Sequence, residues 1–190
     1  MITIRLADAS TDATAVAAIY RPSVADSFIS FEEEPPAAAE MATRIEATLV
    51  RTPWLVAVDD DEVVGYAYAS RHRERAGYRW SVDVSAYVRE DRRGRGIAAA
   101  LYQSLIRILT AQGFANAYAG ITQPNRASVA LHRSIGMELV GVYRGVGYKL
   151  GAWRDVAWYQ LRLTGPGNSP AEPIPVRELL AARPSLVTEP

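Results

Sequence analysis

A strand that runs into a glycine- and arginine-rich turn and then into a helix is the feature that most constrains this chain. Apolar and polar side chains alternate over Trp80–Val88, which is the period of a half-buried strand. From Ile97 to Ile108 apolar residues recur at intervals of three or four, which predicts a helix. Glycines in the intervening segment 92–96 let the backbone approach a ligand, and the first N–H groups of a helix have no intrahelical partner. The turn therefore predicts an anion site, against the alternative of a tight basic turn that binds nothing.

The remaining pattern predicts a layered domain around this unit. Expected strands cover residues 3–7, 54–58, 63–70, 80–88, 115–121, 137–149 and 153–163. Expected helices lie around 16–24, between Pro36 and Pro53, from Ile97 to Gly113 and from Asn125 to Ile135. This order predicts an α/β (α+β layered) fold with a mixed central sheet of about seven strands flanked by about four helices. We assign residues 1–164 to the domain and 165–190 to a Pro-rich C-terminal tail, in which only Val176–Ala182 could form a helix.

The composition excludes several kinds of site and partner. The chain has 190 residues, with 21 basic and 21 acidic side chains, so its overall charge does not point to nucleic acid or to an anionic membrane. It has no cysteine, which excludes disulfides, cysteine zinc sites and a cysteine nucleophile, and with two histidines we expect no metal site. The first residues alternate like a strand, unlike a signal peptide, and no window approaches the ~18 apolar residues that cross a bilayer. We expect a cytoplasmic protein.

Charge is unevenly distributed along the sequence. No Asp or Glu lies between Arg92 and Met137, although this stretch holds six arginines, which favours a ligand with several phosphates. The spacing G-x-G-x-x-A from Gly94 also fits the dinucleotide fingerprint. That fingerprint expects an acid about 20 residues later, and none occurs before Glu138. A P-loop is excluded because the sequence has no Gly-Lys-Ser/Thr.

The turn also matches the R-x-x-G-x-A form, at Arg93, Gly96 and Ala98, with which the GCN5-related N-acetyltransferase superfamily holds the pyrophosphate of CoA. Over about residues 2–163 the chain resembles the phosphinothricin acetyltransferase branch of that superfamily. Further matching segments are PWLVA at 53–57, AGYRW at 76–80, YV at 87–88, AQGF at 111–114, then Pro124, Asn125, Ser128, Val129 and His132, and finally Gly151, Trp153, Asp155 and Val156. The resemblance implies a GCN5-related N-acetyltransferase fold and an enzyme that uses acetyl-CoA.

The resemblance also implies how the cofactor is held. Backbone groups of one strand would pair with the pantetheine arm, the turn would hold the pyrophosphate, and the start of the next helix would contact the cofactor. The implied residues are Ala86, Tyr87 and Val88 in the strand, Arg93, Gly94, Arg95, Gly96, Ile97 and Ala98 in the turn, and Asn125 and Ser128 in the helix. Helix capping alone would also explain Asn125 and Ser128.

Two side chains are candidates for proton transfer. An α-amine is mostly protonated at neutral pH, so attack on a thioester benefits from a general base. Asp83 lies among apolar residues just before the pantetheine segment, where burial would raise its pKa. The family position usually holds Glu, and a solvated acid is the alternative. His132 matches a family His and could relay or donate a proton, whereas a lone helical histidine is more often structural. His72 lies in an arginine-rich loop, and we give it no catalytic role.

The acceptor is expected to meet basic and aromatic side chains, since arginine forks bind oxyanions in bidentate fashion. The candidates are Arg73, Arg75, Tyr78 and Arg79 in the loop before the site strand, with Arg79 and Tyr78 favoured, and Lys149 and Trp153 in the late hairpin, which match positions near the acceptor in relatives. The alternative is that this basic loop is solvated and binds no ligand. Relatives often carry an acid-Thr pair after the first helix, but here the sequence reads Ala25-Asp26-Ser27, so the pocket could differ.

These observations predict an N-acetyltransferase that acts on the α-amine of a small amino-acid-like acceptor such as phosphinothricin, methionine sulfoximine or methionine sulfone. Since the chain has no cysteine for an acetyl-enzyme, we expect direct attack in a ternary complex. The alternatives are an acetyltransferase for protein N-termini or other amines, and a non-catalytic acyl-CoA-binding module. Relatives are commonly dimers, so the resemblance implies a homodimer.

Overall fold

The computed structural model of the chain describes residues 2–165 and 170–187. Within these residues the strands are β1 (Thr3–Leu6), β2 (Trp54–Asp59), β3 (Glu62–Arg71), β4 (Ser81–Val88), β5 (Asn116–Thr122), β6 (Glu138–Lys149) and β7 (Ala152–Arg162). The α-helices are α1 (Ala9–Ala25), α2 (Ala38–Leu49), α3 (Ile97–Gln112), α4 (Arg126–Ser134) and α5 (Val176–Ala182), with short 3₁₀ segments η1 (Ala76–Tyr78), η2 (Glu90–Arg92) and η3 (Pro184–Val187). No helix among the described residues is both long and apolar enough to cross a membrane.

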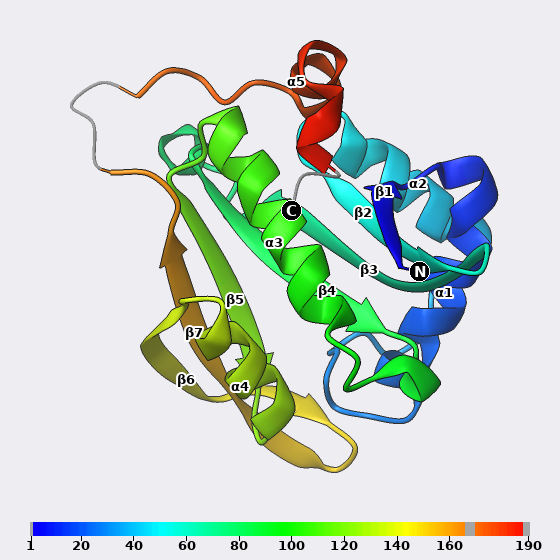
Figure 1. Cartoon of the computed structure of the whole chain (residues 1–190). Coiled ribbons are helices and arrows are strands. Elements are labelled where there is room, and N and C mark those ends of the chain that lie inside the picture. The colour runs from blue at the N-terminus through cyan, green and yellow to red at the C-terminus, as the bar shows by residue number, and fades with distance from the viewer. Residues whose placement is uncertain (1, 166–169, 188–190) are drawn as a thin grey trace.

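The strands form one sheet in the order β1-β2-β3-β4-β5-β7-β6, in which only β4 and β5 are parallel neighbours. Helices cover both faces (Figure 1). A Cβ on Gly65 of β3 would meet Ile97 of α3, whereas the next residue, Tyr66, lines a pocket with Tyr20 of α1. Because successive strand residues face opposite sides, α3 covers one face, and α1 with α2 covers the other. The expected mixed, layered sheet is confirmed.

The sheet divides between β4 and β5. These strands pair only over Ser81–Asp83 with Asn116–Tyr118. Beyond that point β4 continues along β3 as far as Val88, while β5 continues along β7 as far as Thr122. The two strands therefore diverge, as Figure 1 shows. Residues 84–88 of β4 keep one edge that no described strand occupies.

Helix α1 begins earlier than its apolar stripe at 16–24 predicted. Asp8 is its N-cap, and the Asp8 side chain accepts a hydrogen bond from the backbone N–H of Ser10. Asp12 lies inside the first turn and is buried, and Arg5 of the neighbouring strand donates two hydrogen bonds to its carboxylate. The polar residues 8–12 thus form the N-cap and first turn of the helix, ahead of its apolar stripe.

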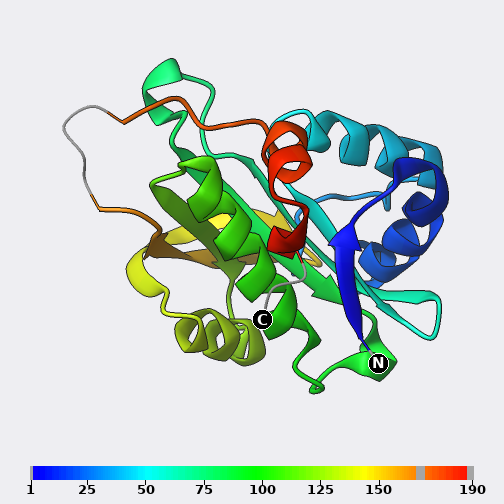
Figure 2. The same ribbon diagram turned by 45° about the horizontal axis from the view of Figure 1, so that its top comes forward.

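The C-terminal segment packs on the domain, contrary to the expected separate tail. Helix α5 forms at the residues that the sequence indicated, and Val176 is fully buried in the same core as the sheet. Gln112 at the end of α3 donates its side-chain amide to the carbonyl of Ile174, and Arg107 donates to the carbonyl of Leu186. Figure 2 shows α5 and η3 lying beside α3. Apolar side chains of α5 and η3 thus share one core with those of α3.

Candidate active site

A cavity of about 470 Å³ lies where β4, the start of α3 and α4 meet, and we call it the α3 cavity. It lies along the free edge of β4. The residues predicted to hold CoA line it with one exception: Ala86, Tyr87, Val88, Arg93, Gly94, Gly96, Ile97, Ala98, Asn125 and Ser128 do so, and Arg95 does not. Three separate predictions, for the strand, the turn and the helix start, thus converge on one cavity.

The turn before α3 presents backbone groups to this cavity. Gly94 and Gly96 have positive φ values of 76° and 80°, a conformation that other residues adopt only at a cost. A Cβ at either glycine would meet no atom within 4 Å, so the surface above them is open. Gly96 is the N-cap of α3 and supplies no side chain to cap it, which leaves N–H groups of the first turn for an anion. Arg93 pairs with Glu90 at 3.2 Å but stays half exposed.

The start of α4 combines capping with cavity lining. The side-chain oxygen of Asn125 accepts a hydrogen bond from the backbone N–H of Ser128 at 3.1 Å. Both residues also line the α3 cavity. Asn125 therefore caps α4, as the alternative reading proposed, and Asn125 and Ser128 line the cavity as well.

His132 is buried and lines the α3 cavity. Its Nδ1 lies 2.7 Å from the carbonyl oxygen of Ser128, so this nitrogen must be the donor. Its Nε2 then accepts from the hydroxyl of Tyr102 at 2.9 Å. Burial lowers the pKa of His132, which favours the neutral ring. The sequence predicted a proton donor or relay here, but both ring nitrogens are already engaged.

A second cavity of about 490 Å³ opens on the α1 side of the sheet, and we call it the Asp83 cavity. Its lining is mainly apolar and comes from distant segments: Ile29, Phe31, Ser70, Asp83, Val84, Ser85, Gly120, Thr122, Tyr143, Val146, Val156 and Trp158. A smaller space of about 70 Å³ is lined by Ser85 and Thr122 of this cavity and by Ala86 and His132 of the α3 cavity. This small space therefore lies between the two cavities, where β4 and β5 diverge.

Asp83 is the only charged residue among the described side chains that line its cavity. Its carboxylate is 27% exposed. Burial raises the pKa of Asp83, although the nearby His72 and Arg73 oppose the shift. The Nδ1 atom of His72 lies 2.6 Å from Oδ1 of Asp83. No local sequence pattern assigned His72 a role, because 11 residues separate it from Asp83 and only the β3–β4 pairing brings the two together.

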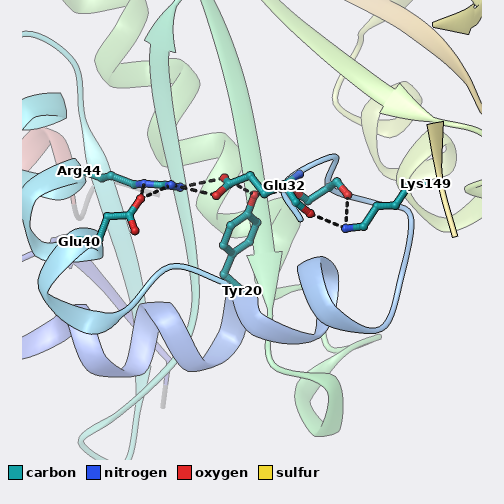
Figure 3. Close-up of polar contacts among 6 residues, drawn as sticks. Tyr20, Glu32, Glu40, Arg44 and Lys149 are labelled. Atoms are coloured by element: carbon teal, nitrogen blue, oxygen red, sulfur yellow. Dashed lines mark hydrogen bonds and ion pairs between the residues drawn. The ribbon is translucent and has the colours of Figure 1, made fainter. Parts of the chain in front are cut away.

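The loop between α1 and α2, residues 26–37, forms one wall of the Asp83 cavity. Lys149 at the end of β6 fixes this loop, because its Nζ donates to the carbonyl oxygens of Val24, Ser30 and Glu32 at 2.6, 2.7 and 2.6 Å. An ammonium group has three N–H donors, so all are used. Lys149 was predicted to bind the acceptor, and the structure instead makes it an anchor of the loop (Figure 3).

The side chain of Glu32 extends this anchor to the helices. Both of its carboxylate oxygens accept from Arg44 of α2, at 2.8 and 2.9 Å, and one also accepts from the hydroxyl of Tyr20 at 2.9 Å. Arg44 also pairs with Glu40, as Figure 3 shows. The Arg44 guanidinium, followed by the Tyr20 hydroxyl, holds the pKa of Glu32 below its usual value. The loop is thus tied to α1, α2 and β6 at once.

The arginine loop before β4 divides into two parts. Arg73 lies over the ring of Trp158, 5.7 Å from its centroid, and so flanks the Asp83 cavity. Arg79 instead pairs with Glu172 at 2.6 Å and stacks on Trp80, away from that cavity. Arg73 therefore lies nearer the Asp83 cavity than Arg79, although the sequence analysis favoured Arg79.

The remaining predicted acceptor residues lie outside the Asp83 cavity. Tyr78 is 45% exposed, with its ring edge toward His72 at 6.1 Å. Arg75 is exposed at the start of η1. Trp153 is 68% exposed on the β6–β7 hairpin, where its ring lies edge-on to Tyr148. None of the three is among the described residues that line the cavity.

Comparison with known proteins bears on the family of this chain. Residues 4–158 match the family described as acetyltransferase (GNAT) domain. A phosphinothricin N-acetyltransferase of Streptomyces viridochromogenes is 36% identical over 93% of this chain and 93% of its own. An L-methionine sulfoximine/L-methionine sulfone acetyltransferase of Pseudomonas paraeruginosa is 37% identical over 84% of this chain and 94% of its own. The crystal structure of a phosphinothricin acetyltransferase from Sinorhizobium meliloti with acetyl-CoA superposes with a TM-score of 0.86, at 40% identity over 91% of this chain and 95% of that one.

Proposed function

The chain belongs to the GNAT acetyltransferase family, and we propose that it transfers an acetyl group from acetyl-CoA to the α-amine of a small amino acid in a ternary complex. It is an N-acetyltransferase of the phosphinothricin and methionine sulfoximine acetyltransferase type. The finer assignments, which are the reaction path, the acceptor and the residue roles, are our proposal.

One observation carries the proposal: the two cavities meet at β4. The free edge at 86–88 borders the α3 cavity, and Asp83 lines the other cavity a few residues earlier on the same strand. Across the small space between them, an amine in the Asp83 cavity would reach a group held along the strand edge. Since reacting atoms must come within about 3–3.5 Å, such a junction is what a transfer reaction requires.

The α3 cavity fits acetyl-CoA, which would supply the acetyl group as a thioester. The open glycine turn offers backbone N–H groups to the pyrophosphate, and Arg93 adds positive charge. The unoccupied edge of β4 offers backbone donors and acceptors to the amides of the pantetheine arm. These groups are fixed before the cofactor arrives, which lowers the entropic cost of binding.

Asp83 is the general base in this proposal. The acceptor enters as an ammonium ion, and the Asp83 carboxylate takes one of its protons so that the amine nitrogen has a free electron pair. A base with a raised pKa is better matched to this task than an ordinary aspartate. His132 has a smaller part, because both of its ring nitrogens are already hydrogen-bonded.

The lining of the Asp83 cavity favours an acceptor with an uncharged side chain. No lysine or arginine is among the described residues that line it, and Ile29, Phe31 and Trp158 make its walls apolar. Phosphinothricin carries a phosphinate anion that would lack a partner there, whereas methionine sulfone and methionine sulfoximine have neutral polar groups. Arg73 at the rim would pair with the α-carboxylate.

The test is an acceptor screen in which the free thiol of released CoA is detected. We expect kcat/KM for methionine sulfone and methionine sulfoximine to exceed that for phosphinothricin by about tenfold or more. Initial-rate patterns should intersect, since transfer is direct. Tight CoA binding without thiol release across a broad amine panel would reject the proposal in favour of a non-catalytic acyl-CoA-binding module.

We also propose that two copies associate through the β6–β7 hairpin. Seven large apolar side chains of this hairpin are half exposed or more: Leu139, Val140, Tyr143, Val146, Tyr148, Leu150 and Trp153. Such a patch on a small protein marks an interaction surface. Light scattering after gel filtration should give the mass of a dimer, and Trp153→Glu should give the mass of a monomer. A monomeric unmodified protein would reject this part.

A further inference from the structure

His72 lies against Asp83 at the point where β4 and β5 separate. It follows directly after β3, and its Nδ1 is 2.6 Å from Oδ1 of Asp83. Its ring stacks on that of Tyr118, with centroids 4.4 Å apart and planes 19° apart. Tyr118 is the register partner of Asp83 in β5. One imidazole therefore contacts both members of the last β4–β5 pair.

The His72 ring is held on several sides. Besides Tyr118, the edges of Trp158 and Tyr78 approach it, with centroids 6.2 and 6.1 Å away. Its side chain is 13% exposed. These aromatic contacts come from β5, β7 and η1, so folding fixes the imidazole before any ligand binds. A hydrogen bond from a fixed donor orients its acceptor more firmly than one from a mobile side chain.

The direction of the hydrogen bond follows from the chemistry of the two groups. An ionised carboxylate only accepts, so Nδ1 of His72 is the donor and Oδ1 of Asp83 is the acceptor. A hydrogen bond to the charged form favours that form. It opposes the effect of burial, which raises the pKa of Asp83. His72 thus acts on both the orientation and the ionisation of this carboxylate.

We propose that His72 is the positioning residue of the catalytic base: its Nδ1–H holds Oδ1 of Asp83 so that Oδ2 meets the acceptor amine. The inference rests on the proposed function. In the proton step one N–H bond of the acceptor ammonium breaks, its electron pair stays on nitrogen, and the proton binds Oδ2. Asp83 then gives that proton to water. His72 keeps its own proton throughout and touches neither substrate.

Other groups around Asp83 cannot supply the same effect at neutral pH. They are Arg73 and Tyr78 from the loop after β3, Tyr68 from β3, Tyr118 from β5, Tyr143 from β6 and Glu32 from the α1–α2 loop. Arginine stays charged, and tyrosines ionise only near pH 10 or above. Glu32 is paired with Arg44, which holds its pKa low. Of the neighbouring groups, His72 is the one whose ring nitrogen lies within hydrogen-bond distance of the Asp83 carboxylate.

Two variants of His72 separate positioning from packing. His72→Phe keeps a flat ring for the stack on Tyr118 but has no donor. His72→Asn puts an uncharged N–H donor near the position of Nδ1. We expect His72→Phe to lower kcat about tenfold with the KM for acetyl-CoA unchanged, and to move the acidic limb of the rate profile roughly one pH unit higher, because the Asp83 carboxylate loses its donor. His72→Asn should recover most of kcat.

The pKa of Asp83 is measured in parallel on the free enzyme, by NMR of 13C-labelled carboxyl groups, with Asp83→Asn to identify the signal. We expect that pKa to rise in His72→Phe and to return toward the wild-type value in His72→Asn. An unshifted pKa in His72→Phe, or equal losses of kcat in both variants with unshifted limbs, would overturn the inference and leave the proposed function standing. A wild-type rate in Asp83→Asn would instead show that Asp83 is not the general base. The positioning role of His72 would then be rejected with it.

Discussion

The α3 cavity and the Asp83 cavity are built in different ways, although they meet on one strand. The α3 cavity draws largely on two stretches of sequence, 86–99 and 125–132, and much of its chemistry is backbone N–H groups and glycine conformation. The Asp83 cavity draws on one to three residues from each of β3, β4, β5, β6, β7 and the α1–α2 loop. Its chemistry is that of side chains, with one carboxylate among apolar walls.

This difference teaches how the two halves of the reaction can be changed. A site made of backbone tolerates side-chain substitution, because the N–H groups stay in place as long as the turn keeps its shape. A site made of side chains from many segments changes with each substitution. We therefore expect the cofactor to be the constant half of the reaction and the acceptor the variable half.

The largest expected effect is that of Asp83→Asn, which tests whether the side-chain-built cavity holds the base. The amide cannot take a proton, so kcat should fall about 10²–10⁴-fold while the KM for acetyl-CoA changes little. Steady-state kinetics with both substrates varied is the measurement. Glu138→Gln, at an exposed acid that starts β6, is the matched control and should keep the wild-type rate. An unchanged rate in Asp83→Asn would reject the assignment of Asp83 as the general base.

Arg93→Ala tests how far the α3 cavity depends on a side chain in addition to its backbone. A charge-assisted hydrogen bond contributes about 1.5–3 kcal/mol, and the half exposure of Arg93 favours the lower end, so the Kd for CoA should rise about tenfold. Titration calorimetry at fixed salt measures it. Arg95→Ala is the control, because Arg95 does not line the cavity. Equal effects of the two substitutions would mean that only overall charge matters.

Lys149→Met asks whether the wall of the Asp83 cavity is set by a distant anchor. The substitution keeps a long unbranched side chain and removes two hydrogen bonds to the α1–α2 loop and one to the last turn of α1. We expect the free energy of unfolding to fall by about 1.5–3 kcal/mol and the acceptor KM to rise several-fold. Acetyl-CoA binding should be unaffected. Urea unfolding and acceptor kinetics measure the two effects. A rise in acceptor KM without any loss of stability would restore Lys149 as a direct acceptor contact.

Arg79→Ala should have the smallest effect. Its partner is Glu172, both side chains are more than a third exposed, and such pairs contribute about 0–1 kcal/mol. The acceptor KM should change less than about twofold, whereas Arg73→Ala should raise it about tenfold. The measurement is the acceptor KM of each variant, from initial rates at varied acceptor concentration. The reverse order would mean that the arginine loop rearranges when the acceptor binds.

Much of the fold could be predicted, because the strand alternation and helical stripes are local. The glycine turn could be predicted for the same reason, since its strand, turn and helix are consecutive in sequence. The Asp83 cavity was only partly predictable. Asp83 lies on a recognisable strand, but the contact of His72 with it depends on the β3–β4 register. The anchor role of Lys149 depends on a loop more than 100 residues away. No local pattern records such pairs.

The anchored lysine has a further consequence for an enzyme that modifies amines. Lys149 is the only lysine in the chain, and its three N–H groups are directed at backbone carbonyls. A nitrogen held in this way cannot turn an electron pair toward a thioester without releasing the loop. The protein thus works beside a reactive acyl donor while offering it no free ε-amine of its own, and its arginines supply nearly all its positive charge without that chemical liability.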